Sequence, residues 1–190
     1  VALTREVTER LLAAALAVFS GASPGETLSP AGEAARWAFL TLLQIGRDDG
    51  DASRVVALGE QAARLPFSDA DRRAFRMAAA DRASTDHAIA IYTELFDRDP
   101  TDSEVAQKLF ELHEAHGDRY ALIAIRGQQI DNAVDPHERG RLRLDLAHRL
   151  AEANRGDAAV QVLRTSLTEI PGDEATVAAL ATRLEADGRS

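Results

Sequence analysis

The sequence predicts an all-α protein, a right-handed α-solenoid of about ten helices arranged as repeated antiparallel pairs. Five prolines recur at nearly constant intervals, with spacings of 36, 34, 36 and 35 residues. A fixed period in this range is typical of helical repeat arrays. The prolines of this series are Pro30, Pro66, Pro100, Pro136 and Pro171.

A second series of turn signals divides each period into two segments of helix length. Aromatic residues make up only 5% of the chain, so leucine, valine, isoleucine and alanine must fill the core. This composition favours closely packed helices over a β-sandwich, and the repeating unit is therefore helix, turn, helix, turn. The second series is Gly50-Asp51, Thr85-Asp86, Gly117-Asp118 and Gly156-Asp157.

The first half of the chain is predicted to contain five helices. The first covers Leu3 to Phe19, and Ser29 with Pro30 opens the second as N-cap and first-turn proline. The second helix contains an uncharged run from Trp37 to Ile45, so we expect it to be covered on more than one side. The others begin after Asp51, at Ser68, and at Ser84 or Thr85.

The second half is predicted to contain five more helices. Thr101 to Glu104 has the capping-box pattern and opens the sixth helix, which Gly117 ends. The seventh carries Leu122 and Ile125 at helical spacing. The remaining three begin at Asp135-Pro136, after Gly156-Asp157 and after Gly172-Asp173.

These segments predict a single repeat domain over residues 1–190. Both ends are unusually apolar for terminal repeats, which normally turn a polar face to water. Leu11 to Phe19 is apolar around the whole helix, so we expect either a segment of a longer protein or a dimer contact there, with an intact small protein as the alternative. Leu12→Glu is the first substitution expected to disrupt such a contact. The predicted parts are a leading helix and loop (1–29), repeats 30–65, 66–99, 100–135 and 136–170, and a final half repeat (171–190).

The net charge of −9 and the pI near 5.0 argue against a binder of nucleic acid, for which a basic face is expected. The absence of cysteine excludes disulfides, Cys-ligated zinc and a thiol nucleophile. Lys108 is the only lysine, which together with abundant alanine suggests a bacterial protein from a GC-rich genome. Leu11 to Phe19 resembles a signal-peptide core, but Glu6 and Glu9 replace its basic region. We therefore expect a cytoplasmic protein without a membrane span, with secretion as the alternative.

Candidate catalytic and metal-binding residues are few, and we expect no cofactor and no metal. His113 and His116 lie three residues apart beside Glu111 and Glu114, whereas metalloprotease spacing needs histidines four apart. A solvated helix end explains them better. Asp145 and His148 are interpreted as a weak pair, and Asp48, Asp49 and Asp51 as part of a turn. Five arginines are interpreted as a helix surface with ordinary ion pairs: Arg139, Arg141, Arg143, Arg149 and Arg155.

From about Ala88 onward the chain resembles the tetratricopeptide repeats, whose 34-residue unit places a small residue and an aromatic before a proline. Ala88, Tyr92 and Pro100 occupy those places. The following units continue the pattern with Leu109, Phe110 and Gly117-Asp118, and then with Leu146, Ala147, Leu150 and Pro171.

The resemblance implies a protein or peptide partner bound along the first helices of the pairs. In the third unit it assigns Glu104, Gln107, Glu111 and Glu114 to that face, which would be acidic. The lysine and asparagine set with which some family members hold a peptide's terminal carboxylate has no match here.

We therefore expect a non-catalytic protein interaction scaffold. The alternative is a structural or oligomerisation module of a larger enzyme or regulatory protein, with a homodimer formed through the terminal helices. A helical hydrolase built on His113 and His116 is the least favoured hypothesis, because no catalytic motif supports it.

Overall fold

The computed structural model describes residues 2–19, 21, 29–186 and 188. Within these residues the chain forms ten α-helices and no β-strand, which confirms the all-α prediction. Two compact units, Val1–Leu95 and Phe96–Ser190, meet inside the fifth helix. The handedness of a continuous solenoid stays a prediction.

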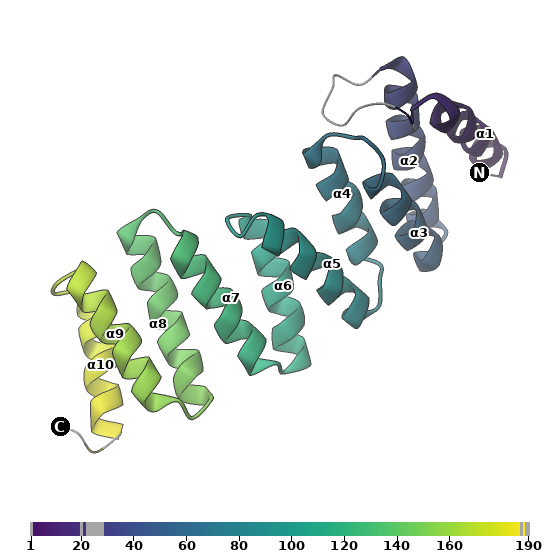
Figure 1. Cartoon of the computed structure of the whole chain (residues 1–190). Helices are drawn as coiled ribbons and strands as arrows, with labels where there is room; N and C mark the ends of the chain where they lie inside the picture. The colour runs from purple at the N-terminus through teal and green to yellow at the C-terminus, as the bar shows by residue number, and fades with distance from the viewer. Residues whose placement is uncertain (1, 20, 22–28, 187, 189–190) are drawn as a thin grey trace. The chain divides into compact units, whose positions relative to one another are not determined.

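Unit 1 contains α1 (Ala2–Phe19), α2 (Pro30–Asp48), α3 (Ala52–Ala63), α4 (Asp69–Ala80) and most of α5 (Thr85–Arg98). Unit 2 contains α6 (Ser103–His116), α7 (Arg119–Asn132), α8 (Pro136–Glu152), α9 (Gly156–Glu169) and α10 (Glu174–Ala186). Within unit 2 each helix packs against the next and reverses direction at a short turn, as do α2, α3 and α4 in unit 1, where α1 also packs against α2 (Figure 1).

Short polar side chains start the helices where the sequence predicts. At α3 and α7 an N-cap aspartate, Asp51 or Asp118, accepts a hydrogen bond from the backbone N–H three residues later, at 3.0 and 3.1 Å. Ser29 and Ser68 do the same for α2 and α4. Each bond satisfies one of the backbone donors that a helix start leaves unpaired. These local bonds explain why the helix starts can be predicted from sequence.

Two predicted helix starts are wrong in detail. The N-cap of α6 is Asp102, whose carboxylate accepts from the Val105 N–H at 3.1 Å. Thr101 instead donates its hydroxyl to the Asp99 carboxylate at 2.5 Å, so it belongs to the preceding turn. At α9 the helix begins with Gly156 itself, because Asn154 adopts the left-handed conformation and makes the turn earlier.

The core of unit 1 is built around Phe67, which lies in the turn between α3 and α4 and is fully buried. Its ring centroid lies 4.8 Å from Phe19 of α1, 6.3 Å from Phe39 of α2 and 5.4 Å from Phe75 of α4. Offset and edge-on aromatic contacts at these distances are favourable. One side chain from a turn thus joins three helices.

Helices α3 and α4 cross very closely at Gly59. A Cβ atom placed on this glycine would lie 2.6 Å from the Phe75 carbonyl oxygen and 2.9 Å from the Ala79 Cβ. The two backbones can approach this closely only because position 59 has no side chain. Gly59 therefore sets the packing distance inside unit 1.

The prediction that α2 is covered on more than one side is confirmed, since α2 packs against both α1 and α3 (Figure 1). Its buried face carries Phe39, Leu42 and Leu43. Trp37 nevertheless points away from this face and is 54% exposed. At about 3.6 residues per turn it lies more than half a turn along the helix from Ala35 and Phe39, both of which are buried.

Helix α1 is apolar on two faces, one buried and one exposed. Leu12, Ala15 and Phe19 lie in the core, whereas Val7 and Val18 are 58% and 70% exposed. Leu12→Glu is therefore the wrong substitution for testing an external contact, because it would put a charge inside unit 1. The exposed apolar face has to be tested at Val7.

Candidate functional site

The four residues predicted for the first-helix face lie in one row on α6. Glu104, Gln107, Glu111 and Glu114 are all exposed, and their spacings of three and four residues keep them on the same side of the helix. The Gln107 side-chain amide donates a hydrogen bond to the Glu111 carboxylate at 2.8 Å. We call these four residues the α6 acidic row.

The C-terminal end of the α6 acidic row, at Glu114, is in contact with α8. Arg149 of α8 reaches the Glu114 carboxylate at 3.4 Å, and its guanidinium stacks on the Phe110 ring of α6 at 4.3 Å. Arg126 of α7 stacks on the same ring, also at 4.3 Å. Both guanidinium groups thus lie within cation–π distance of the Phe110 ring, which favours both of them.

Asp145 of α8 joins these two arginines. Its carboxylate accepts from Arg126 Nε at 2.5 Å and from Arg149 Nε at 3.1 Å. Partial burial raises the pKa of Asp145, but the hydrogen bonds and charges of the two arginines outweigh burial and lower it overall. The weak pairing of Asp145 with His148 expected from sequence does not form, because the arginines occupy the carboxylate.

A second arginine pair holds α8 to α9. Arg139 Nε donates to the Glu169 carboxylate at 2.9 Å, and Arg143 donates to its other oxygen. These hydrogen bonds lower the pKa of Glu169 from 4.5 to about 2. Because the folded pKa lies below the unfolded one, the stabilisation is present above pH 4.5 and is lost as the pH falls towards 2.

The arginines of α8 therefore have distinct environments. Arg139 and Arg143 are engaged with Glu169, and Arg149 with Asp145 and Glu114. Arg141 is exposed and pairs with Glu138 one turn away, as the sequence predicts for an ordinary helix surface. Of these four arginines, Arg141 is the one whose side chain is mostly exposed to solvent.

The two histidines of α6 do not face a common point. His113 is mostly buried, with Nδ1 3.7 Å from the Asp118 carboxylate, whereas His116 is exposed. In the part of the chain that the structure describes, no group of three or more metal-ligating side chains could hold an ion. The solvated helix end predicted from sequence is confirmed for His116 but is wrong for His113, whose side chain is only 13% exposed.

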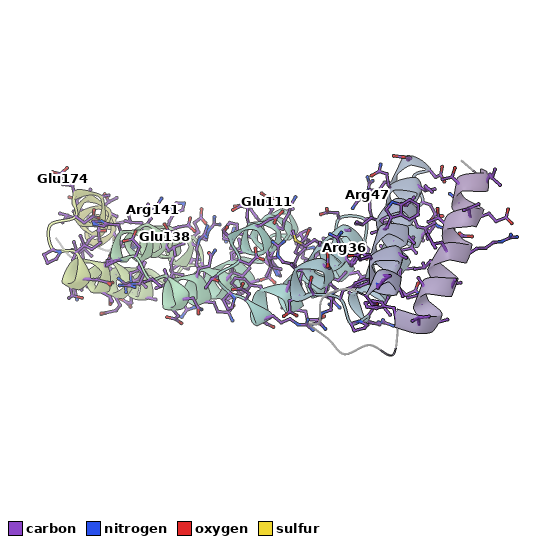
Figure 2. The ribbon with its side chains drawn as sticks, turned by 90° about the horizontal axis from the view of Figure 1, so that it is seen from above. Arg36, Arg47, Glu111, Glu138, Arg141 and Glu174 are labelled. Carbon is purple, nitrogen blue, oxygen red and sulfur yellow. The ribbon has the colours of Figure 1, made fainter. Side chains whose placement is uncertain are left out.

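The first helices of unit 2 present one common face. Figure 2 shows Glu111 of α6, Glu138 and Arg141 of α8 and Glu174 of α10 directed to the same side. Helices α6 and α8 are connected by the contacts of Arg149, and α8 packs against α10. We call this surface the first-helix face of unit 2. It is acidic over α6 and mixed over α8.

An apolar cavity of about 290 Å³ opens between α8, α9 and α10. Alanines from all three helices form much of its wall, including Ala147, Ala151 and Ala179, and Leu163 of α9 lies at its base. His148 and Thr182, both exposed, lie at its mouth. Sequence analysis missed this cavity; small residues on facing sides of neighbouring helices were the available signal.

These features define an all-α protein of antiparallel helix pairs, with an exposed first-helix face in unit 2. Among the described helices none is long and apolar enough to cross a membrane. No model of a known protein family matches the sequence, and no curated protein matches it.

The solved structures that resemble the fold include two described as MamA. One is described as the crystal structure of MamA protein, with a TM-score of 0.46, 14% identity, and coverage of 81% of this chain and 83% of that one. The other is described as MamA MSR-1 C2, with a TM-score of 0.44, 17% identity, and coverage of 81% and 87%. At these values neither similarity carries an argument about function.

Proposed function

We propose that this chain is a non-catalytic scaffold of the tetratricopeptide type, and that it binds an extended peptide segment of a partner protein across the first-helix face of unit 2. The α6 acidic row carries the proposal. Glu104, Glu111 and Glu114 place three carboxylates on one exposed side of α6. Only Glu111 and Glu114 are like charges at helical spacing, which is unfavourable by about 0.2–0.5 kcal/mol, and Arg149 already offsets part of this at Glu114. A basic ligand adds attraction to the carboxylates along the rest of the row.

Charge complementarity identifies the chemistry of the partner. A row of exposed carboxylates steers positively charged segments towards α6 and rejects acidic ones. The side-chain amide of Gln107 adds a neutral donor to the row. The partner segment should therefore carry arginine or lysine at the positions that cross α6.

The test selects 12-residue peptides from a random display library on the full chain and measures their dissociation constants by fluorescence anisotropy. We expect selected peptides to be rich in arginine or lysine and to bind less tightly as salt rises. The double variant Glu104→Lys, Glu111→Lys should weaken binding at least about tenfold, since it replaces attraction with repulsion.

Asp131→Lys is the matched control, because Asp131 is an exposed carboxylate on α7, a second helix. It makes the same charge change as Glu111→Lys alone, half that of the double variant, but outside the α6 acidic row, and it should leave the dissociation constant within about twofold. Glu111→Lys alone is therefore compared with it directly. A selection that yields no binder, or binders equally tight on the double variant, contradicts the proposal.

The exposed face of α1 favours a second candidate function, self-association of the oligomerisation type. Leu3, Val7 and Val18 lie on one side of α1, and all are more than half exposed. Light scattering over a concentration series should then show a mass above 20.5 kDa that Val7→Glu returns to the monomer. Ala13→Glu, on the polar side of α1, is the control, and a constant mass of 20.5 kDa contradicts this candidate.

A further inference from the structure

We propose that the cavity between α8, α9 and α10 binds one large apolar side chain of the peptide, such as leucine or methionine. That a peptide supplies the side chain rests on the proposed function, whereas the binding of an apolar side chain by the cavity does not depend on it. At about 290 Å³ the cavity has the volume of roughly ten water molecules in the liquid, enough for such a side chain.

The lining of the cavity favours an apolar occupant over water. Most of its wall consists of alanine and leucine side chains, which offer no hydrogen bonds. A buried water needs two to four polar partners, and only His148, Thr182 and Arg183 are polar here. His148 pairs with Glu152 at 3.3 Å, and the Arg183 guanidinium packs against Gly156 at the start of α9. An apolar group therefore fits the interior better than ordered water.

The cavity lies on the same side of unit 2 as the α6 acidic row. His148 at its mouth lies seven residues after Arg141, on the same face of α8, and Figure 2 shows Arg141 directed to the same side as Glu111. Arg149, the residue after His148, contacts Glu114, so this end of the row and the cavity are at a similar height, with α8 between them. Glu104 lies about 15 Å farther along α6. A peptide that crosses the helices can occupy both.

The spacing of the two contacts follows from the distance between helices. Packed helices lie roughly 8–10 Å apart, and the first helices α6, α8 and α10 contact one another less closely than sequential helices do, so the path from α6 across α8 to the cavity is on the order of 20 Å. An extended chain advances about 3.3 Å per residue. The expected ligand therefore carries a basic residue and, about six residues away, a large apolar residue.

The cavity is tested first without any peptide. N-acetyl-L-leucine amide is titrated into the ¹⁵N-labelled full chain, and we expect the amide signals of Ala147, Ala151 and Ala179 to shift. N-acetyl-L-alanine amide should shift them far less at the same concentration. Ala151→Leu fills the cavity from α8 and should abolish the leucine response, and Ala179→Leu fills it from α10 if the first variant fails to fold.

The peptide is tested next, using the tightest binder from the display selection. Replacing its apolar residue with alanine should weaken binding about 10–100-fold on the natural chain, the range expected for burial of one leucine side chain. On Ala151→Leu the same replacement should have little effect. Ala124→Leu adds the same volume on the exposed side of α7 and should leave both peptides unchanged.

The outcomes separate the two proposals. No response of the cavity signals to the leucine amide overturns the cavity inference, and so does a selected peptide whose apolar residue is dispensable. A leucine response together with a failed peptide selection supports the cavity and contradicts the peptide scaffold. Both proposals are supported if the leucine amide and a selected peptide bind, and if Ala151→Leu abolishes the leucine response and makes the peptide's apolar residue dispensable.

Discussion

Phe67→Ala is expected to lower the free energy of unfolding of unit 1 by about 3–5 kcal/mol. The side chain is fully buried and contacts the rings of Phe19, Phe39 and Phe75, which come from three helices. Its removal leaves a cavity that three helices would have to move to close. One residue of the short turn between α3 and α4 thus contributes to the stability of three helices.

Urea unfolding followed by tryptophan fluorescence measures this loss directly. Trp37 is the only tryptophan, so its signal reports on unit 1, whereas circular dichroism averages both units. Leu3→Ala is the matched control in the same unit, because Leu3 of α1 is an apolar residue that is 74% exposed. It should change the free energy of unfolding by less than about 0.5 kcal/mol. Equal midpoints for the two variants would contradict the central role of Phe67.

Gly59→Ala is expected to destabilise unit 1 by about 1–3 kcal/mol, the range found for overpacked cores. The added Cβ would lie 2.6 Å from the Phe75 carbonyl oxygen, and a backbone atom cannot move aside as a flexible side chain can. Helices α3 and α4 would have to separate. Urea unfolding followed by Trp37 fluorescence measures the loss.

Gly127→Ala is a control with the opposite expected sign. Gly127 lies inside α7, and a Cβ placed there meets no atom within 4 Å. Replacing a glycine inside a helix by alanine stabilises by about 0.5–1 kcal/mol when no clash results. Trp37 fluorescence gives the unfolding of unit 1, so the remaining circular-dichroism transition measures this change in unit 2. A stabilising Gly59→Ala would show that the α3–α4 crossing is looser than the structure indicates.

The helix order could be predicted from sequence because the signals that end and begin helices are local. Pro30, Gly117 and Asp135 act within a few residues of their own positions, through fixed φ angles or bonds to nearby N–H groups. The error at Thr101 arose for the same reason, since Asp102 beside it is an equally good cap. Local signals identify a helix start to within a residue or two.

The contacts that shape the face of unit 2 could not be predicted in the same way. Asp145 binds Arg126, which lies 19 residues away, and Arg149 reaches Glu114 across 35 residues. Such partners depend on how three helices pack. The exposure of Trp37, by contrast, could have been predicted from a helical projection of the sequence, because Ala35, Phe39 and Leu42 lie together on the buried side of α2 and Trp37 does not.

The central claim, that a basic peptide binds across the first helices of unit 2, is tested most directly by mapping a selected peptide on the ¹⁵N-labelled full chain. We expect the largest amide shift changes along the α6 acidic row, from Glu104 to Glu114, and near His148 on α8. Signals of α1 and of the exposed side of α7 should stay in place. Shift changes confined to α1, or to the second helices α7 and α9, would contradict the account.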